Sequence, residues 1–156
     1  MNKDFQLASK AYEVETAILK LDKNILEQYQ LETESNITIT NKDEAIKLGV
    51  DFPDGLELLG ANYNKTTGTT VILCQDTNTG EILASCAGTN FYPGETSKDV
   101  NNWLDIMSYG ISPYGEEVNS IINFFNQMGM YPSRISGHSL GGCIAQLVLS
   151  SKNDFV

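Results

Sequence analysis

The first part of the chain has the hydrophobic spacing of an amphipathic helix. Apolar residues recur at intervals of three and four positions, which is the period of one face of an α-helix. These positions are Phe5, Leu7, Ala8, Ala11, Tyr12, Val14, Ile18, Leu19 and Leu21, with Glu15 among them. The pattern predicts a helical segment over residues 1 to about 34. Such a face is usually a packing face and occasionally an interaction arm.

The pattern changes to that of a β-sheet from Leu56 onward. Three runs predict strands over Leu56–Tyr63, Thr69–Cys74 and Glu81–Ala87. The sequence Asp76-Thr77-Asn78-Thr79-Gly80 lies between the second and third runs, and its composition is typical of a turn. We therefore expect three successive strands, with a turn between the last two.

A helix, a short strand and a second helix are predicted in the last third of the chain. Ser112-Pro113 is typical of a helix start, and an apolar stripe at helical spacing follows it. Arg134-Ile135-Ser136 then predicts a short strand, and Leu140 to Ser151 again has helical spacing. This order predicts an α/β protein. We divide the chain into a helical N-terminal segment, residues 1–50, and an α/β part, residues 51–156.

Length and composition are those of one globular domain. The chain has 156 residues, of which 41% are hydrophobic. No stretch approaches the roughly 18 apolar residues of a transmembrane helix, and the N-terminus lacks the apolar core of a classical signal peptide. We expect a soluble protein without a transmembrane segment, either cytoplasmic or exported by a signal-independent route.

The net charge of −10 restricts the classes of partner. Nucleic-acid binding requires a basic surface that displaces counterions from phosphates, so it is not expected here. Electrostatic docking on anionic lipid is not expected either, because it requires clustered Lys and Arg. Any contact with a membrane would have to be hydrophobic.

The cysteine and histidine content predicts neither a disulfide framework nor a metal site. The three cysteines Cys74, Cys86 and Cys143 are an odd number without regular spacing. Two lie in predicted strands and one in a predicted helix, so buried free thiols are expected. With a single histidine and no paired-cysteine motif, no metal and no other cofactor is predicted.

The run Gly137-His138-Ser139-Leu140-Gly141-Gly142 has the pattern of a nucleophile elbow. In such an elbow the serine lies on a tight turn between a strand and a helix, with its oxygen clear of the sheet. Gly137 and Gly141 leave room where strand and helix approach each other closely. A glycine-rich turn that contains a serine by chance is the alternative. The strand predicted before Ser139 and the helix predicted after it favour the elbow.

A second block precedes the elbow. It consists of the segment Gly80–Thr89, which is followed by Asn102-Trp103-Leu104-Asp105. Together with Gly137–Gly142, this block resembles the class 3 lipases, fungal-lipase-like members of the α/β-hydrolase superfamily. The resemblance implies an α/β-hydrolase-like sheet with flanking helices. It also implies a serine carboxylic-ester hydrolase that acts on a lipid or acyl ester. The chain departs from the family at Cys86-Ala87, where Phe-Arg is usual.

The resemblance also implies a role for individual residues. Ser139 would be the acyl-accepting nucleophile, and the backbone N–H groups of Leu140 and Thr89 would form the oxyanion hole. His138 would pack near the elbow without acting as the base. Asp105 would brace the corner at Thr89, and an ordinary surface or capping aspartate is an equally good interpretation of that residue.

Residues 89–112 correspond to the place where the family carries a lid or an acyl-contacting loop. Their apolar side chains either line the acyl site or pack into the core, and both interpretations remain open. These side chains are Phe91, Tyr92, Trp103, Leu104, Ile106, Met107 and Tyr109.

A complete catalytic triad is not found in the sequence. In this superfamily the serine is followed by an acid and then by a histidine, but the only histidine, His138, precedes Ser139. Asp154 is the only carboxylate after Ser139, and an intervening helix would place it about 16 Å or more away. We expect the acid and base to come from a missing C-terminal part that carries further strands and helices. A partner chain of a split enzyme and a non-catalytic hydrolase-fold binding module are the alternatives.

Overall fold

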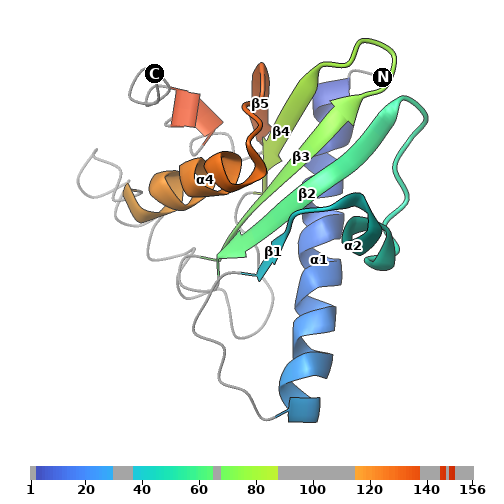
Figure 1. The fold of residues 1–156 in the computed structure, drawn as a ribbon, viewed down its shortest axis with the longest axis vertical. Helices are drawn as coiled ribbons and strands as arrows, with labels where there is room; N and C mark the ends of the chain where they lie inside the picture. Colours follow the sequence, from blue (N-terminus) through green and yellow to red (C-terminus); the bar gives the residue numbers. More distant parts are fainter. Residues whose placement is uncertain are drawn as a thin grey trace.

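The computed structural model describes residues 3–29, 37–64, 68–87, 115–137, 145–146 and 148–149. The helices are α1 (Lys3–Tyr29), α2 (Lys42–Lys47) and α4 (Gly115–Met128), and the strands are β1 (Ile37–Ile39), β2 (Leu56–Asn64), β3 (Thr69–Asp76), β4 (Ile82–Cys86) and β5 (Arg134–Gly137). In the described part of the chain, the strands form one mixed sheet in the order β1-β2-β3-β4-β5 (Figure 1). The first three pairs are antiparallel, and β4 pairs with β5 in parallel.

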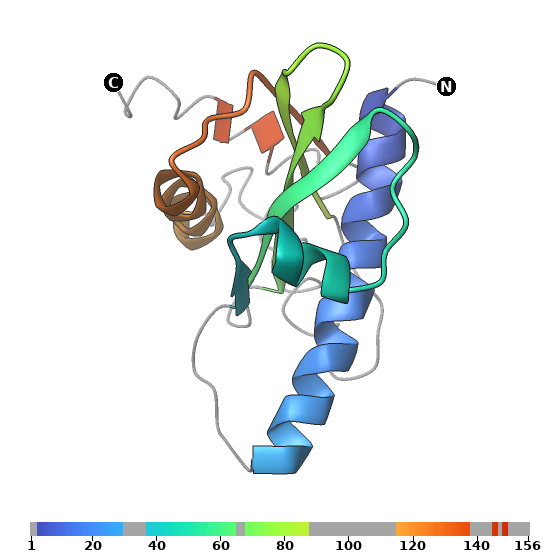
Figure 2. The same cartoon turned by 45° about the vertical axis from the view of Figure 1, so that its right-hand side comes forward.

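Helices cover both faces of this sheet. Figure 2 shows the sheet between α1 on one side and α4 on the other. Two separate clusters of buried hydrophobic residues fill the space between the layers, and α1 contributes to one and α4 to the other. The expected α/β class, with flanking helices and an N-terminal helix, is therefore confirmed.

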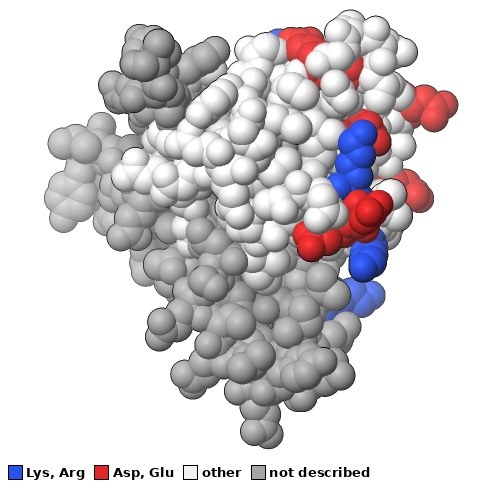
Figure 3. Space-filling view, in the orientation of Figure 1, with Lys and Arg blue, Asp and Glu red and all other residues white. Residues whose placement is uncertain are grey.

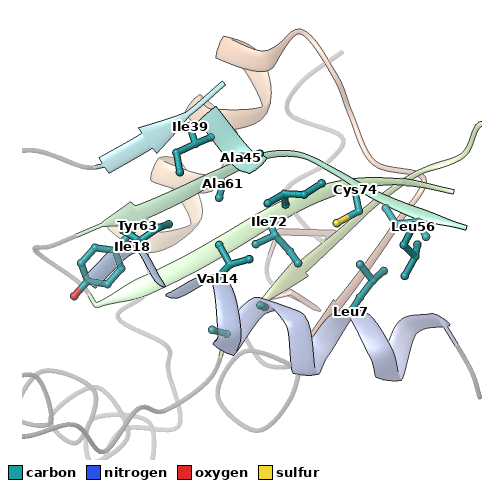
Figure 4. Close-up of a cluster of buried hydrophobic side chains, with 14 residues drawn as sticks. Leu7, Val14, Ile18, Ile39, Ala45, Leu56, Ala61, Tyr63, Ile72 and Cys74 are labelled. Atoms are coloured by element: carbon teal, nitrogen blue, oxygen red, sulfur yellow. The ribbon is translucent and has the colours of Figure 1, made fainter. Parts of the chain in front are cut away.

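Helix α1 packs through four residues in its first half. Leu7, Ala11, Val14 and Ile18 are each 0% exposed and lie against β2, β3 and β4 (Figure 4). Their spacing of four, three and four positions places them on one side of the helix. Phe5 was expected on the same face but is 65% exposed, because residues two positions apart on a helix do not face the same way.

The central strands are confirmed close to their predicted bounds. Strands β2, β3 and β4 each begin and end within two residues of the expected positions. Strand β3 is buried without interruption from Thr69 to Cys74, because the sheet is covered on both faces. The predicted turn is also present, with the Gly80 N–H donating to the Asp76 carbonyl at 2.7 Å. Gly80 has φ of 75°, a conformation that favours glycine in turns.

Two short elements follow α1 in the N-terminal third: a strand that was not expected, and a helix that agrees with the expected helical segment 1–50. Residues 37–39 lie in the segment 1–50 that was expected to be helical, but they form β1 and pair antiparallel with β2. A three-residue strand is too short to show alternation, so the sequence pattern does not reveal it. Helix α2 begins after Asn41, whose Oδ1 accepts a hydrogen bond from the Glu44 N–H at 2.9 Å. This is an N-cap that the Asn-x-x-Glu sequence signals.

Helix α4 and strand β5 confirm the elements expected in the last third. Helix α4 covers the predicted apolar stripe, and Ile121, Phe124 and Phe125 are buried on it. Its expected start at Ser112-Pro113 lies outside the described residues. In the ranges that the structure describes, no helix is both long enough and apolar enough to span a bilayer.

Ion pairs connect the start of α1 to the sheet. Lys3 Nζ lies 2.5 Å from Asp76 Oδ2, and the hydrogen bond from Lys3 is the main reason that the pKa of Asp76 is lowered. Arg134 bridges Asp4 and Glu81, at 3.2 Å to each carboxylate. Further basic and acidic side chains lie next to one another along the side where α2 lies (Figure 3). The pairs of Arg134 and of Lys42 are largely exposed and contribute little stability, whereas the carboxylate of Asp76 is buried.

Gly60 of β2 lies close to both β1 and α4. It follows an irregularity in the β2–β3 register between Leu58 and Gly60. A Cβ at this position would lie 2.6 Å from the Ile39 carbonyl oxygen of β1 and 2.7 Å from Met128 Cε of α4. The first of these neighbours is backbone and cannot rotate away, so a side chain at position 60 would have to displace β1.

We predict that Gly60→Ala lowers the free energy of unfolding by about 1–3 kcal/mol through overpacking. Urea denaturation followed by circular dichroism measures this loss as a lower midpoint with an unchanged slope. Adding Met128→Ala should recover only part of it, because the contact with the Ile39 carbonyl remains. A midpoint equal to that of the original chain would contradict the close approach of β1 to Gly60.

Candidate active site

The candidate site begins at the carboxyl ends of β4 and β5. These strands are parallel neighbours, and their register runs from Leu83 opposite Arg134 to Cys86 opposite Gly137. Parallel neighbours end at the same edge of a sheet, about 4.8 Å apart. They also require a long crossover connection, which here includes α4.

In the sequence, the two motifs of the predicted site come directly after the carboxyl ends of these two strands. Gly88-Thr89 come after Ala87 at the end of β4, and His138-Ser139-Leu140 come after Gly137 at the end of β5. In open α/β sheets, ligands bind outside the carboxyl ends of the strands. Because Cys86 lies opposite Gly137, the segment with Thr89 and the segment with Ser139 both begin next to this pair of residues.

Most of the predicted site residues lie outside the described part of the chain. These residues are Thr89, Asp105, His138, Ser139, Leu140 and Gly141, together with the apolar side chains of residues 89–112. Gly137 is described, as the last residue of β5 and half-buried. The structure thus places the strand that precedes the predicted elbow, and the roles expected for the other residues stay predictions.

The strand that leads to Thr89 is held in place up to its last described residue. Ala87 is buried, and its N–H donates to the Thr70 carbonyl of β3 at 2.9 Å. This hydrogen bond extends the β3–β4 ladder by one residue beyond the Val71–Cys86 pair. The position from which Gly88-Thr89 depart is therefore determined by β3.

The helix predicted after the elbow is present where the structure describes it. Residues 145–146 and 148–149 are helical. Ala145 and Val148 are buried in the cluster that α4 shares with the sheet, whereas Leu149 is 42% exposed. Ala145 and Val148 thus pack on the α4 side of the sheet, and the expected helix over 140–151 lies outside the described residues apart from 145–146 and 148–149. A strand before the elbow and a helix after it agree with the predicted context of the motif.

A groove of about 440 Å³ lies between α1 and β5 and ends at the candidate site. Its lining residues are Asp4, Phe5, Ala8, Ser9, Tyr12, Ser136 and Gly137. From β5 only the last two residues, Ser136 and Gly137, line the groove, and the other lining residues come from α1. The groove therefore includes Gly137, after which the predicted elbow follows in the sequence.

Two buried thiols lie in the strands behind the site. Cys74 and Cys86 are buried and free, which confirms the expectation for these two cysteines, and Cys143 lies outside the described residues. Burial raises the pKa of Cys86 to about 12 and also raises the pKa of Cys74, because desolvation disfavours the thiolate. Within the described ranges, no group of His, Cys, Asp and Glu side chains could hold a metal ion.

Sequence analysis assigned no role to one polar residue near this edge. Glu15 was placed on the packing face of the N-terminal helix, and the structure buries it to 1% exposure beside Thr70 of β3. The available signal was an acidic residue within an apolar stripe, since glutamate is almost never fully buried unless it is paired. Its partner on β3 could not be read from the sequence.

Comparison of the chain with models of protein families, with curated proteins and with solved structures finds no match. The resemblance to class 3 lipases therefore rests on the two sequence blocks alone. The mixed sheet with helices on both faces defines an α/β architecture, and this architecture is shared by many unrelated functions. A function for this chain has to be argued from the site.

We predict that Cys74 and Cys86 resist iodoacetamide in the folded protein near neutral pH. Their raised pKa values leave almost no thiolate, and the thiolate is the reactive form. Mass spectrometry of a Cys143→Ser variant measures these two thiols without the third, and both should react fully after denaturation in guanidinium chloride. Rapid alkylation of either thiol in the folded state would show that its strand is accessible.

Proposed function

We propose that this chain is a serine carboxylic-ester hydrolase of lipase or phospholipase type, with Ser139 as its nucleophile. The observation that carries the proposal is the parallel pairing of β4 with β5 up to Cys86 and Gly137. Because of this pairing, the strand that precedes Thr89 and the strand that precedes Ser139 end next to each other at one edge of the sheet. An acyl-transfer site needs this combination, because the nucleophile and the oxyanion donors must surround the same carbonyl group.

The proposed reaction follows from these roles. The Ser139 hydroxyl attacks the ester carbonyl and forms a tetrahedral intermediate, which releases the alcohol and leaves an acyl-enzyme. The backbone N–H groups of Thr89 and Leu140 donate to the oxyanion, and one such donor typically contributes about 10²–10³ in rate. Water then releases the acid from the acyl-enzyme. The substrate is an ester of a fatty acid or of a smaller acyl group.

The proton transfers require a base and an acid besides Ser139. His138 is the only histidine, and it adjoins the serine on the predicted sharp turn, where its ring cannot easily reach the serine oxygen. We propose that an imidazole and a carboxylate from outside these 156 residues complete the site, on a further part of the protein or on a partner chain. The isolated 156-residue chain is then expected to be weakly active or inactive.

We predict that a fluorophosphonate probe labels Ser139 in the longest native form of the protein. The probe reacts only with a serine that is activated and faces an oxyanion hole, so labelling reports the assembled site. Ser139→Ala should abolish labelling completely. Ser133→Ala, which removes an exposed hydroxyl just before β5 and outside the groove, is the matched control and should retain it. The proposal fails if the native protein is not labelled at position 139.

A second candidate function is a non-catalytic binding module with the same fold. The observation that favours it is the groove between α1 and β5, where the exposed Phe5 offers an apolar contact. Deletion of the N-terminal helix is not a suitable test, because α1 provides Leu7, Val14 and Ile18 to the core. A test of binding must therefore change the surface of α1 and leave its buried face intact.

The binding-module interpretation predicts that Phe5→Ser releases a partner that the original chain retains in a pull-down. The exposed Ile46 of α2 is the matched control: it is 75% exposed and does not line the groove, so Ile46→Ser should retain the partner. The loss should be at least tenfold if Phe5 is an interface anchor, since anchor residues contribute about 2 kcal/mol or more. Labelled Ser139 together with equal retention by both variants would contradict this interpretation.

A further inference from the structure

Glu15 is a buried carboxylate in the middle of α1. It is 1% exposed and lies between the buried residues Val14 and Ile18. Thr70 of β3, which is 0% exposed, donates a hydrogen bond from Oγ1 to Glu15 Oε2. Transfer of a carboxylate from water to such a position is costly unless it is hydrogen-bonded, and the hydrogen bond from Thr70 offsets part of this cost.

Thr70 connects this carboxylate to the end of β4. Its side chain binds Glu15, and its backbone carbonyl accepts the hydrogen bond from the Ala87 N–H at 2.9 Å. Ala87 is followed in the sequence by Gly88-Thr89, the segment proposed to supply an oxyanion donor. A polar path thus runs from α1 through Thr70 of β3 to Ala87, the last described position before the proposed oxyanion hole. It adds to the hydrophobic packing of α1, because Ala87 lies in the same buried cluster as Leu7 and Val14.

We infer that Glu15 is a positioning residue of the proposed hydrolase site, because its hydrogen bond to Thr70 holds the carboxyl end of β4, after which the segment with Thr89 follows in the sequence. The inference rests on the proposed function. Glu15 acts through Thr70 of β3, which is two strands away from β5, so its role is to hold the backbone and not to contact the reacting atoms.

The position of this segment matters more for the rate than for binding. An oxyanion donor stabilises the charge that develops in the transition state and contributes little to the bound ester. A displacement of about 1 Å at a reacting group can lower the rate on the order of 10²-fold. Loss of the hydrogen bond between Glu15 and Thr70 should therefore lower the maximal reaction rate and leave the affinity for the probe nearly unchanged.

The experiment measures how fast a fluorophosphonate probe labels Ser139, as a function of probe concentration, in the longest native form of the protein. Glu15→Leu and Thr70→Val each remove one partner of the hydrogen bond. Each should lower the maximal labelling rate about 10- to 100-fold, with less than a twofold change in the half-saturating concentration. Glu15→Gln keeps an oxygen that accepts from Thr70, so it should restore the rate to within about threefold of the original protein.

The double variant tests whether the two residues act as one unit. If Glu15 acts through Thr70, the variant with both Glu15→Leu and Thr70→Val should label no more slowly than the slower of the single variants. Two independent effects would instead multiply, and this result would overturn the inference. Thr70→Val keeps the shape of threonine but leaves the buried Glu15 without this hydrogen bond, so a loss of stability is expected. The double variant removes both polar groups and avoids that cost, so its labelling rate relative to the original protein decides the test if a single variant does not fold.

A stability control separates positioning from a general structural role. Val14→Ala removes buried volume from the same turn of α1 without touching the hydrogen bond, and thermal unfolding should show a lowered Tm. The inference is overturned if Val14→Ala slows labelling as much as Thr70→Val, or if Thr70→Val does not slow it.

If the original protein is not labelled at Ser139, the proposed function fails and this inference fails with it. Labelling of the original protein with no effect of either Glu15→Leu or Thr70→Val overturns the inference alone.

Discussion

The parallel pairing of β4 with β5 is the constraint on which the rest of this structure depends. The other described strand pairs are antiparallel, and turns or short segments can connect them. In a parallel pair, the chain must return from the carboxyl end of the first strand to the level at which that strand began, so a long crossover connection is needed. Helix α4 lies within this connection and covers one face of the sheet. One pairing therefore determines the layered architecture and brings two strand ends to the same edge.

Helix α1 covers the opposite face of the sheet. Its apolar stripe covers β2, β3 and β4, and without it Ile72, Cys74 and Leu83 would face water. The same helix is joined to the sheet by ion pairs at its start and by a buried hydrogen bond from Glu15 near its middle. These polar contacts are made at two different points along α1, so they fix how the helix is aligned on the sheet. Hydrophobic packing alone is not directional.

Agreement between sequence and structure is best where a long pattern leaves few alternatives. The runs that became β2, β3 and β4 and the stripe of α4 extend over enough positions to reveal their period. Agreement fails at β1, which has only three residues, and at Phe5, which lies on the exposed side of a correctly predicted helix. The acid Glu15 was seen in the stripe, but its burial depends on Thr70, which is 55 positions away in the chain.

The sequence by itself determined where most elements lie, which of their faces are apolar, and that a glycine-flanked serine follows the last short strand. These properties depend on neighbouring residues, because backbone periodicity and turn chemistry act over a few positions. Only the tertiary structure decided that β4 and β5 are parallel neighbours and that Cys86 lies opposite Gly137. It also decided that Glu15 reaches Thr70. Such contacts join residues 50 or so positions apart, and they form only when the sheet and both helix layers pack together.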